Sequence, residues 1–175
     1  MIFHEGFYFY CESKLQRNIH IRKARTIHGI AEDIGTCVWT APSEGGNCHG
    51  IWAPELHLFN GKWYIYFAAD DGRNINHRMW VLESEGSDPF GPYYCHDPLE
   101  TSGWAIDGTP LTLDDGRMFF IWSGWPGKRN GKQNIYIAPM KSPTEMAGPR
   151  VLIATPEQPW ERVAMPICEG PQVLK

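Results

Sequence analysis

The sequence lacks the features that mark membrane, nucleic-acid-binding and metal-dependent proteins. No apolar run approaches the ~20 residues that span a membrane, and residues 1–5 lack the basic and long apolar regions of a signal peptide. The net charge of −4 gives no reason to expect a nucleic acid or an anionic membrane as partner. The seven histidines and five cysteines show no paired spacing of metal ligands. We therefore predict no metal and no cofactor.

Further absences narrow the chemistry and the fold. There is no Gly-X-Ser-X-Gly elbow, so catalysis by a serine nucleophile lacks support. Helical periodicity is nearly absent, and residues 142–146 are the one place where a helical turn is expected. The odd number of cysteines leaves at least one thiol unpaired, and Cys37 with Cys48 is the pair that could bridge a loop.

Aromatic residues are abundant instead. They make up 13% of the 175 residues and include eight tryptophans, in a chain of otherwise ordinary soluble composition and single-domain length. Such a content suits a packed all-β core or a surface that stacks on sugar rings, and the core is the more common role for most of these side chains.

A repeated hairpin pattern organises the chain. Gly6, Gly61 and Gly116 stand at equal intervals of 55 residues, and each precedes an alternating aromatic strand. Prolines open the strand before the turn at Pro54 and Pro110. A repeat of about 50 residues that holds a hairpin and further strand material is typical of a β-propeller blade.

These intervals predict an all-β fold, namely a partial β-propeller of about three blades plus the first strand of a fourth. The expected limits are about 1–50, 51–103 and 104–167 for the blades and 168–175 for the start of the fourth. The chain is expected to begin inside an innermost strand and to end before the next turn. Because a blade buries both faces against its neighbours, two apolar faces would stay uncovered, which predicts poor solubility or self-association.

Three acids stand at or beside the start of an innermost strand: Glu55, Asp107 and Glu169. Such starts converge around a propeller axis, so these carboxyl groups are expected to share a pocket. Converging carboxylates repel one another and raise one pKa, which suits that group to donate a proton to a glycosidic oxygen. The alternative is that each acid caps a turn, which is the better interpretation for any one acid alone.

The motifs around these acids resemble those of a known family. Trp52-Ala-Pro-Glu55, Ala105-Ile-Asp-Gly-Thr-Pro110 and Glu169-Gly-Pro171, in this order and spacing, are similar to glycoside hydrolase family 43. The resemblance covers essentially the whole chain and is closest to the fungal exo-α-L-arabinofuranosidases. It implies a five-bladed propeller that removes arabinose or xylose from plant cell-wall polysaccharides.

The resemblance also implies roles for individual residues. Glu169 matches the general acid, and Asp107 matches the aspartate that orients this acid and tunes its pKa. Trp52 matches an aromatic residue of the sugar subsite, with a core position between blades as the equally weighted alternative. Glu55 stands beside the substrate, with a structural hydrogen-bonding role as its alternative, and Trp125 is expected at the edge of the pocket.

The general base of the family has no counterpart in this chain. The family's base is an aspartate at the opening of the first blade, a site that the glycine count puts upstream of Met1. Without a base no water is activated for inversion at the anomeric carbon, so the chain is expected to be inactive by itself. A structural ion at the propeller axis is possible in the full-length protein.

The expected partner is an arabinose- or xylose-containing oligosaccharide or polysaccharide, which implies an extracellular full-length protein. The main competing interpretation is a non-catalytic carbohydrate-binding fragment or pseudoenzyme, in which the acids are polar lining. An interaction propeller of the kelch kind would show a repeated di-glycine and no converging acids, and neither fits.

Overall fold

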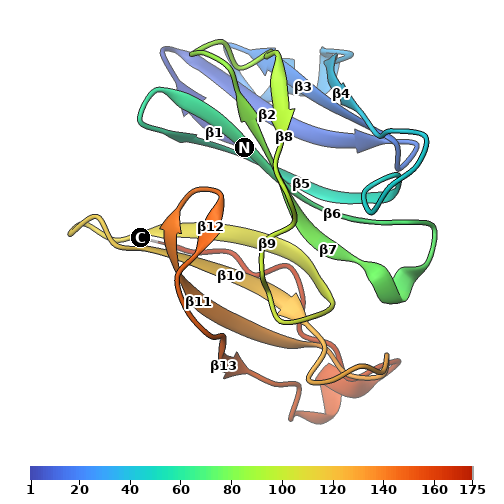
Figure 1. Cartoon of the computed structure of the whole chain (residues 1–175). Helices are drawn as coiled ribbons and strands as arrows, with labels where there is room; N and C mark the ends of the chain where they lie inside the picture. Colours follow the sequence, from blue (N-terminus) through green and yellow to red (C-terminus); the bar gives the residue numbers. More distant parts are fainter. Residues whose placement is uncertain (175) are drawn as a thin grey trace.

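The computed structural model describes residues 1–174, which fold into three antiparallel β-sheets that succeed one another along the chain (Figure 1). The first sheet has the order β1-β2-β3-β4, with strands Ile2–His4, Phe7–Lys14, Asn18–Ala24 and Thr36–Thr40. The second has the order β5-β6-β7-β8, with strands His49–Phe59, Lys62–Asp70, Arg78–Ser84 and Tyr93–Cys95. The third has the order β12-β11-β10-β9 with β13 also paired to β11, and its strands β9 to β13 are Ala105–Thr112, Met118–Gly124, Asn134–Ser142, Glu145–Met146 and Val151–Ala154.

The predicted all-β class is therefore confirmed. The turn glycines Gly6, Gly61 and Gly116 each follow the first strand of a sheet and have φ near +80° (81°, 79° and 84°), a conformation that glycine adopts without steric cost. The sheets cover residues 2–40, 49–95 and 105–154. Their assignment to propeller blades with the limits given above stays a prediction.

Strand β6 lies at the centre of the molecule, because the second sheet is covered on both faces. Every residue of β6 after Lys62 is buried. Tyr64 and Tyr66 belong to the apolar core shared with the third sheet, whereas Trp63 and Ile65 belong to the core shared with the first. This alternation is the period of two that a strand imposes on its side chains. The two cores fix the positions of the innermost strands β5 and β9 that carry the candidate site.

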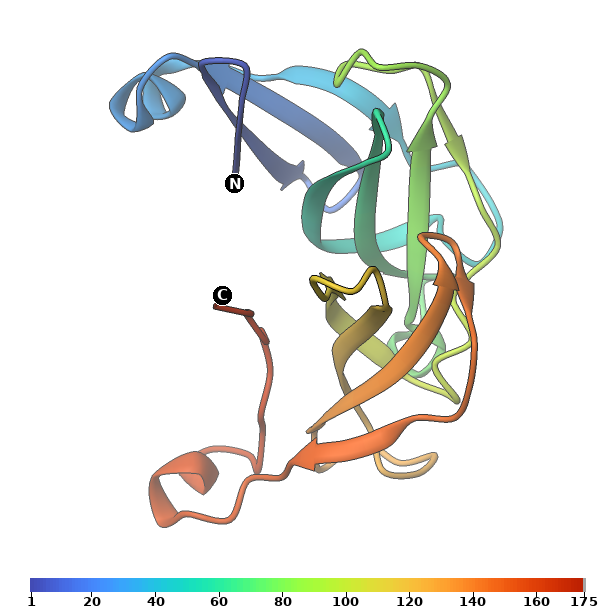
Figure 2. The same ribbon diagram turned by 90° about the vertical axis from the view of Figure 1, so that its left-hand side faces the viewer.

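The three sheets form an arc, and both ends of the chain lie on its open side (Figure 2). This arrangement agrees with part of a propeller ring. No helix within residues 1–174 has the length and apolar content needed to cross a bilayer.

Three local predictions were wrong. Residues 142–146 form a hairpin rather than a helical turn, because Ser142 at the end of β11 pairs with Glu145 of β12. Residues 171–174 carry no strand, since none of the described strands pairs with their backbone to form a ladder. Cys37 and Cys48 are both free thiols, and Cys48 is buried with its Sγ 3.1 Å from the His49 Nδ1 atom.

One short α-helix interrupts the strands. Helix α1, Ile27–Glu32, lies between β3 and β4, and the Thr26 side chain accepts a hydrogen bond from the Gly29 N–H at its start. Two single 3-10 turns, η1 at Asn74–Asn76 and η2 at Pro159–Arg162, follow β6 and β13. The turn η1 contributes Asn74 to the candidate site, and η2 contributes Trp160 and Glu161 to an adjoining hollow.

Candidate active site

Asp107 projects from an irregularity in β9, the innermost strand of the third sheet. The register along β10 shifts between Ile121 and Ser123, so that Asp107 and Gly108 lie opposite the single residue Trp122. Such a β-bulge bends the strand and redirects a side chain. Asp107 has a φ of +53°, a left-handed conformation that aspartate tolerates better than most residues. The bulge therefore sets the direction of this carboxyl group.

Gly108 follows the aspartate because the position has no room for a side chain. A Cβ there would overlap the ring of Phe120 and lie 3.0 Å from the terminal methyl group of Met79. Phe120 and Met79 are both fully buried between the second and third sheets. The Ile-Asp-Gly sequence thus combines an acid on a bulge with the close packing of the innermost strand on the core.

Glu169 reaches the same region from an irregular segment near the C-terminal end. The Gln133 N–H donates a hydrogen bond to the Pro166 carbonyl, and the Cys168 N–H donates one to the Gln133 carbonyl, each at 3.0 Å. The buried hydroxyl of Ser123 donates to the Cys168 carbonyl at 2.9 Å. The third sheet therefore holds the residue immediately before Glu169, while Glu169 itself is exposed.

The two acids are connected through the main chain. The Gly170 N–H donates a hydrogen bond to the Asp107 Oδ2 atom at 3.2 Å. Burial raises the pKa of Asp107, and the negative charge of Glu169 raises it further, against the opposing effect of the Gly170 hydrogen bond. The charge of Glu169 therefore acts directly on the Asp107 carboxyl group.

Asp107 and Glu169 line one cavity of about 420 Å³. Its other lining residues are Trp52, Asn74, Trp104, Ile106, Asn130, Gln133, Met165 and Ile167. Aromatic faces with a few amide groups and two acids are a lining suited to a small neutral polar ligand such as a sugar.

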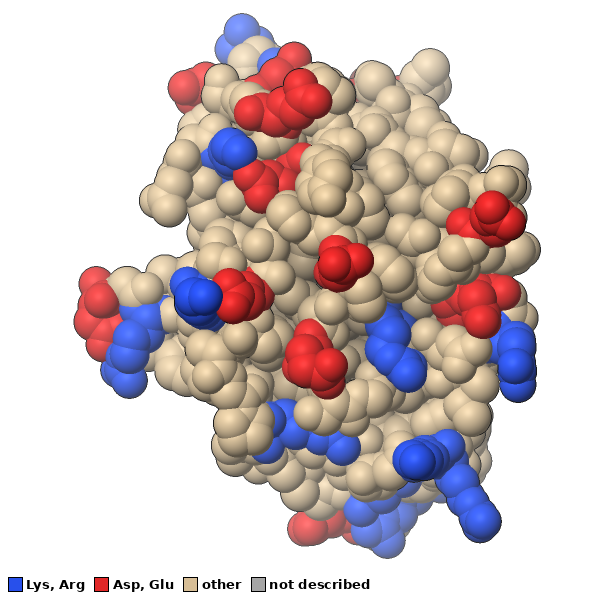
Figure 3. Space-filling model, in the orientation of Figure 1, with Lys and Arg blue, Asp and Glu red and all other residues tan. Residues whose placement is uncertain are grey.

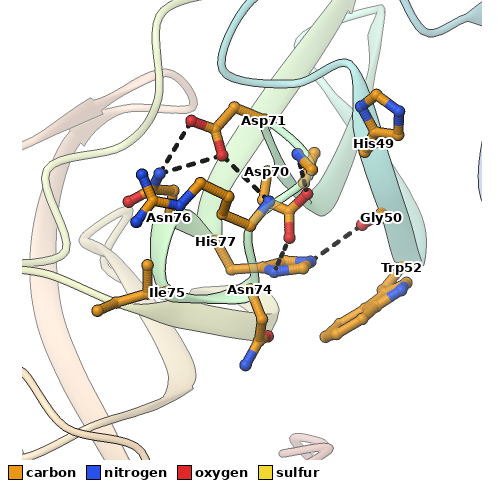
Figure 4. Close-up of polar contacts among 12 residues, drawn as sticks. His49, Gly50, Trp52, Asp70, Asp71, Asn74, Ile75, Asn76 and His77 are labelled. Atoms are coloured by element: carbon orange, nitrogen blue, oxygen red, sulfur yellow. Dashed lines mark hydrogen bonds and ion pairs between the residues drawn. The ribbon is translucent and has the colours of Figure 1, made fainter.

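Trp52 lines this cavity and stacks on a buried histidine (Figure 4). Its ring stacks on the His77 ring with centroids 3.9 Å apart and an interplanar angle of 26°. The His77 Nδ1 atom lies 2.8 Å from the Asp70 Oδ2 atom, and its Nε2 atom lies 3.1 Å from the Gly50 carbonyl. Burial lowers the pKa of His77, and the Asp70 carboxylate acts in the opposite direction. His77 is fully buried, so its ring gives Trp52 a fixed support.

Trp104 lines the cavity, whereas Trp125 lies behind it. The two indole rings stack with centroids 4.6 Å apart and an interplanar angle of 10°. Trp104 also donates from its Nε1 atom to the Asn74 carbonyl at 2.7 Å. Trp125 is only 3% exposed and belongs to the core between the second and third sheets. The structure thus places Trp125 as a support of the wall rather than at the expected pocket edge.

Glu55 lies on a neighbouring cavity of about 770 Å³ that also holds Glu12 and His57. Its carboxylate accepts a hydrogen bond from the Gln172 side-chain amide at 2.6 Å, and the His57 Nε2 atom lies 3.2 Å away. Burial acts to raise the pKa of Glu55, but hydrogen bonds from His57, Thr109 and Gln172 outweigh it, and the pKa is lowered. These contacts keep Glu55 ionised and fit a hydrogen-bonding role.

The three acids do not occupy one position of the repeat. Positive φ values recur at Ala53, Asp107 and Gly170 (+42°, +53° and +61°), each near the start of an innermost segment. Glu55 stands two residues after this position and Glu169 one residue before it. Only Asp107 sits on it, whereas Glu169 lines the same cavity as Asp107 and Glu55 lines a different one.

Several lining residues were not predicted from the sequence. Asn74 belongs to the turn η1, and Asn130 and Gln133 belong to the connection between β10 and β11. The position of Trp104, three residues before Asp107, is the one available signal, because it extends the same motif.

The charged side chains bear on two features, a metal centre within residues 1–174 and the charge of one face of the surface. Within residues 1–174, no group of three or more His, Cys, Asp or Glu side chains is arranged to hold a metal ion. Basic and acidic side chains are interspersed with uncharged surface on the face shown in Figure 3.

Comparison with known proteins identifies the family of the chain. The sequence model of Glycosyl hydrolases family 43 matches residues 1–175. The chain therefore belongs to glycosyl hydrolase family 43.

Characterised relatives and a solved structure are arabinofuranosidases. An extracellular exo-α-(1→5)-L-arabinofuranosidase of Streptomyces chartreusis is 31% identical, over 97% of this chain and 52% of its own length. Alpha-L-arabinofuranosidase 43 of Humicola insolens is 30% identical, over 98% of this chain and 36% of its own length. The crystal structure of an α-L-arabinofuranosidase from Lactobacillus brevis has a TM-score of 0.90 and 32% identity, over 98% of this chain and 57% of that one. The chain thus spans about half, or less, of the length of these proteins.

Proposed function

We propose that this chain forms the acid half of the active site of a glycoside hydrolase acting on plant cell-wall polysaccharide. The bond cleaved is a terminal α-L-arabinofuranosyl linkage, or the corresponding β-xylosyl linkage. The observation that carries the proposal is the joint placement of Asp107 and Glu169 on one cavity, linked by the Gly170 hydrogen bond and walled by Trp52. The names of the relatives support arabinose over xylose as the terminal sugar.

Glu169 is the proposed general acid. It is exposed and lines the cavity, so a sugar bound there would contact its carboxyl group. Asp107 is the proposed positioning residue, because its carboxylate holds the amide of the residue that follows Glu169. A protonated Glu169 then gives its proton to the leaving oxygen as the glycosidic bond breaks.

The reaction proposed is inverting, with water attacking the anomeric carbon from the side opposite the leaving group. No described residue is assigned as the general base. Glu55, the other acid that affects Asp107, is engaged by His57 and Gln172 and lines the neighbouring cavity. The chain by itself is therefore proposed to bind the sugar but to hydrolyse it little. The full-length protein is proposed to act outside the cell on arabinose- or xylose-containing chains.

Ligand-observed NMR tests the sugar site without requiring turnover. Saturation transfer from the protein to p-nitrophenyl α-L-arabinofuranoside is expected on the pentose protons, and to be lost in Trp52→Ala. Tyr94→Ala is the matched control, because Tyr94 is 64% exposed on β8 and lines a different cavity. Equal transfer in all three proteins, or transfer confined to the aryl group, would contradict the proposal.

A further inference from the structure

We propose that the exposed indole of Trp160 forms the subsite for the leaving-group sugar, the residue from which the terminal pentose is cut. The inference rests on the proposed function, because it uses Glu169 as the group that faces the scissile oxygen. It assigns a second binding position, for a neutral furanose or pyranose unit, outside the cavity that holds Asp107.

A second hollow of about 560 Å³ adjoins the cavity of Asp107. Trp160 lines the hollow but not the cavity, whereas Met165, Ile167 and Glu169 line both. Glu169 therefore stands at the boundary between them. A general acid protonates the oxygen that joins two sugars, so the two sugars lie on either side of it. With the terminal pentose beside Asp107, the leaving sugar falls on the Trp160 side.

Trp160 is presented on an ordered turn that does not use its indole. The turn η2 is fixed by the Glu161 Oε2 atom, which accepts hydrogen bonds from the Glu157 and Gln158 N–H groups at 2.7 Å each. The Arg162 Nε atom donates to the Pro156 carbonyl at 2.8 Å. The Trp160 side chain is 74% exposed, and none of the described residues accepts a hydrogen bond from it.

The composition of the hollow fits a sugar better than a charged ligand. Trp160 and Met165 supply apolar surface, and Glu169 supplies an acceptor for hydroxyl groups. The flat face of an indole packs against the C–H face of a sugar ring, while its N–H remains available to a hydroxyl group. Trp160 therefore offers an unused aromatic face in a hollow that shares Met165, Ile167 and Glu169 with the cavity of Asp107.

The test compares L-arabinose with an α-1,5-linked arabinofuranosyl disaccharide, titrated against the 175-residue chain and followed by NMR. The disaccharide is expected to bind about tenfold more tightly than arabinose, which is the gain of one good stacking contact. In Trp160→Ala the disaccharide is expected to bind at most about twofold more tightly than arabinose, whereas the affinity for arabinose itself is unchanged. Trp160→Phe is expected to restore part of the gain, and Tyr94→Ala to leave it intact.

The outcomes separate this inference from the proposed function. Arabinose binding that depends on Trp52, with a disaccharide gain that survives Trp160→Ala, would overturn the Trp160 subsite and leave the function standing. No binding of either sugar would overturn both. Concentration-dependent self-association that disappears in Trp160→Ala, with the disaccharide gain unchanged, would assign the indole to a contact between copies and overturn the subsite.

Discussion

The main-chain N–H of Gly170 donates a hydrogen bond to the carboxylate of Asp107 across 63 residues of sequence. This bond joins the bulge of β9 to the segment that carries the proposed acid. The protonation state of Asp107 is therefore coupled to the position of the Glu169-Gly170 segment. The coupling should be visible in the pH dependence of stability.

Asp107→Asn should change how stability depends on pH. The pKa of Asp107 is raised in the folded state, chiefly by burial and then by Glu169, so the folded protein keeps a proton that the unfolded chain has lost. Stability from this group is therefore present below the ordinary aspartate pKa and is lost as the pH rises through the raised value. Measured by urea unfolding, Asp107→Asn should gain stability relative to the wild type as the pH rises from about 4.

Asp115→Asn is the control with the opposite sign. The N–H group and side chain of Arg117 lower the pKa of Asp115, so this acid stabilises the fold above its ordinary pKa. Its replacement should lose stability relative to the wild type over the same rise in pH. Parallel curves for Asp107→Asn and the wild type would contradict the raised pKa of Asp107 in the folded protein.

Gly108→Ala should destabilise the fold by about 2 kcal/mol, because the added methyl group overlaps the buried ring of Phe120. The control is Gly127→Ala, where nothing lies within 4 Å of the added Cβ and the free energy of unfolding should change by less than about 0.5 kcal/mol. Chemical denaturation measures both. Equal effects of the two changes would show that β9 is not packed closely against the core.

His77→Ala should destabilise the protein by about 3 kcal/mol or more, since it leaves the Asp70 carboxylate buried without its partner. It should also weaken sugar binding, because Trp52 loses the ring on which it stacks. His49→Ala changes an exposed histidine next to the same strand segment and should alter neither quantity appreciably. Unchanged sugar affinity in a folded His77→Ala protein would contradict the role of His77 in holding Trp52.

Much of the fold was predictable because its signals are local. Alternating aromatic strands and the turn glycines define the hairpins, and each operates over fewer than ten residues, as at Gly61 and Gly116. The two-residue strand Glu145–Met146 was missed because an element of that length has no periodicity. The segment 171–174 was predicted as a strand, but a strand also requires a neighbour, which a local pattern does not report.

The candidate site was predictable only where a motif carries it. Asp107 and Glu169 were identified together through their flanking Gly and Pro residues, and the structure places them on one cavity. His77 and Gln133 were not identified, because their contacts with Trp52 and with the segment before Glu169 arise from packing between distant parts of the chain. Trp125 was wrongly expected at the pocket edge. Whether a tryptophan is exposed depends on its neighbours in space, and here Trp104 covers Trp125.

The central claim is that Glu169 is a general acid in a site whose base is not supplied by residues 1–174. Azide tests it directly, because this anion can attack the anomeric carbon in place of an activated water. A C–N bond forms, the glycosidic C–O bond breaks, and the leaving oxygen takes the proton of Glu169. The substrate is the α-1,5-linked arabinofuranosyl disaccharide, whose poor leaving group requires that proton.

The account predicts azide-dependent formation of the β-configured arabinofuranosyl azide, detected by NMR, with no detectable hydrolysis when azide is omitted. Glu169→Gln should reduce this reaction by about 100-fold or more. Absence of the glycosyl azide with the wild-type chain, or its equal formation by Glu169→Gln, would contradict the assignment of Glu169. Hydrolysis without azide that is lost in Glu169→Gln would instead show that the chain contains its own base.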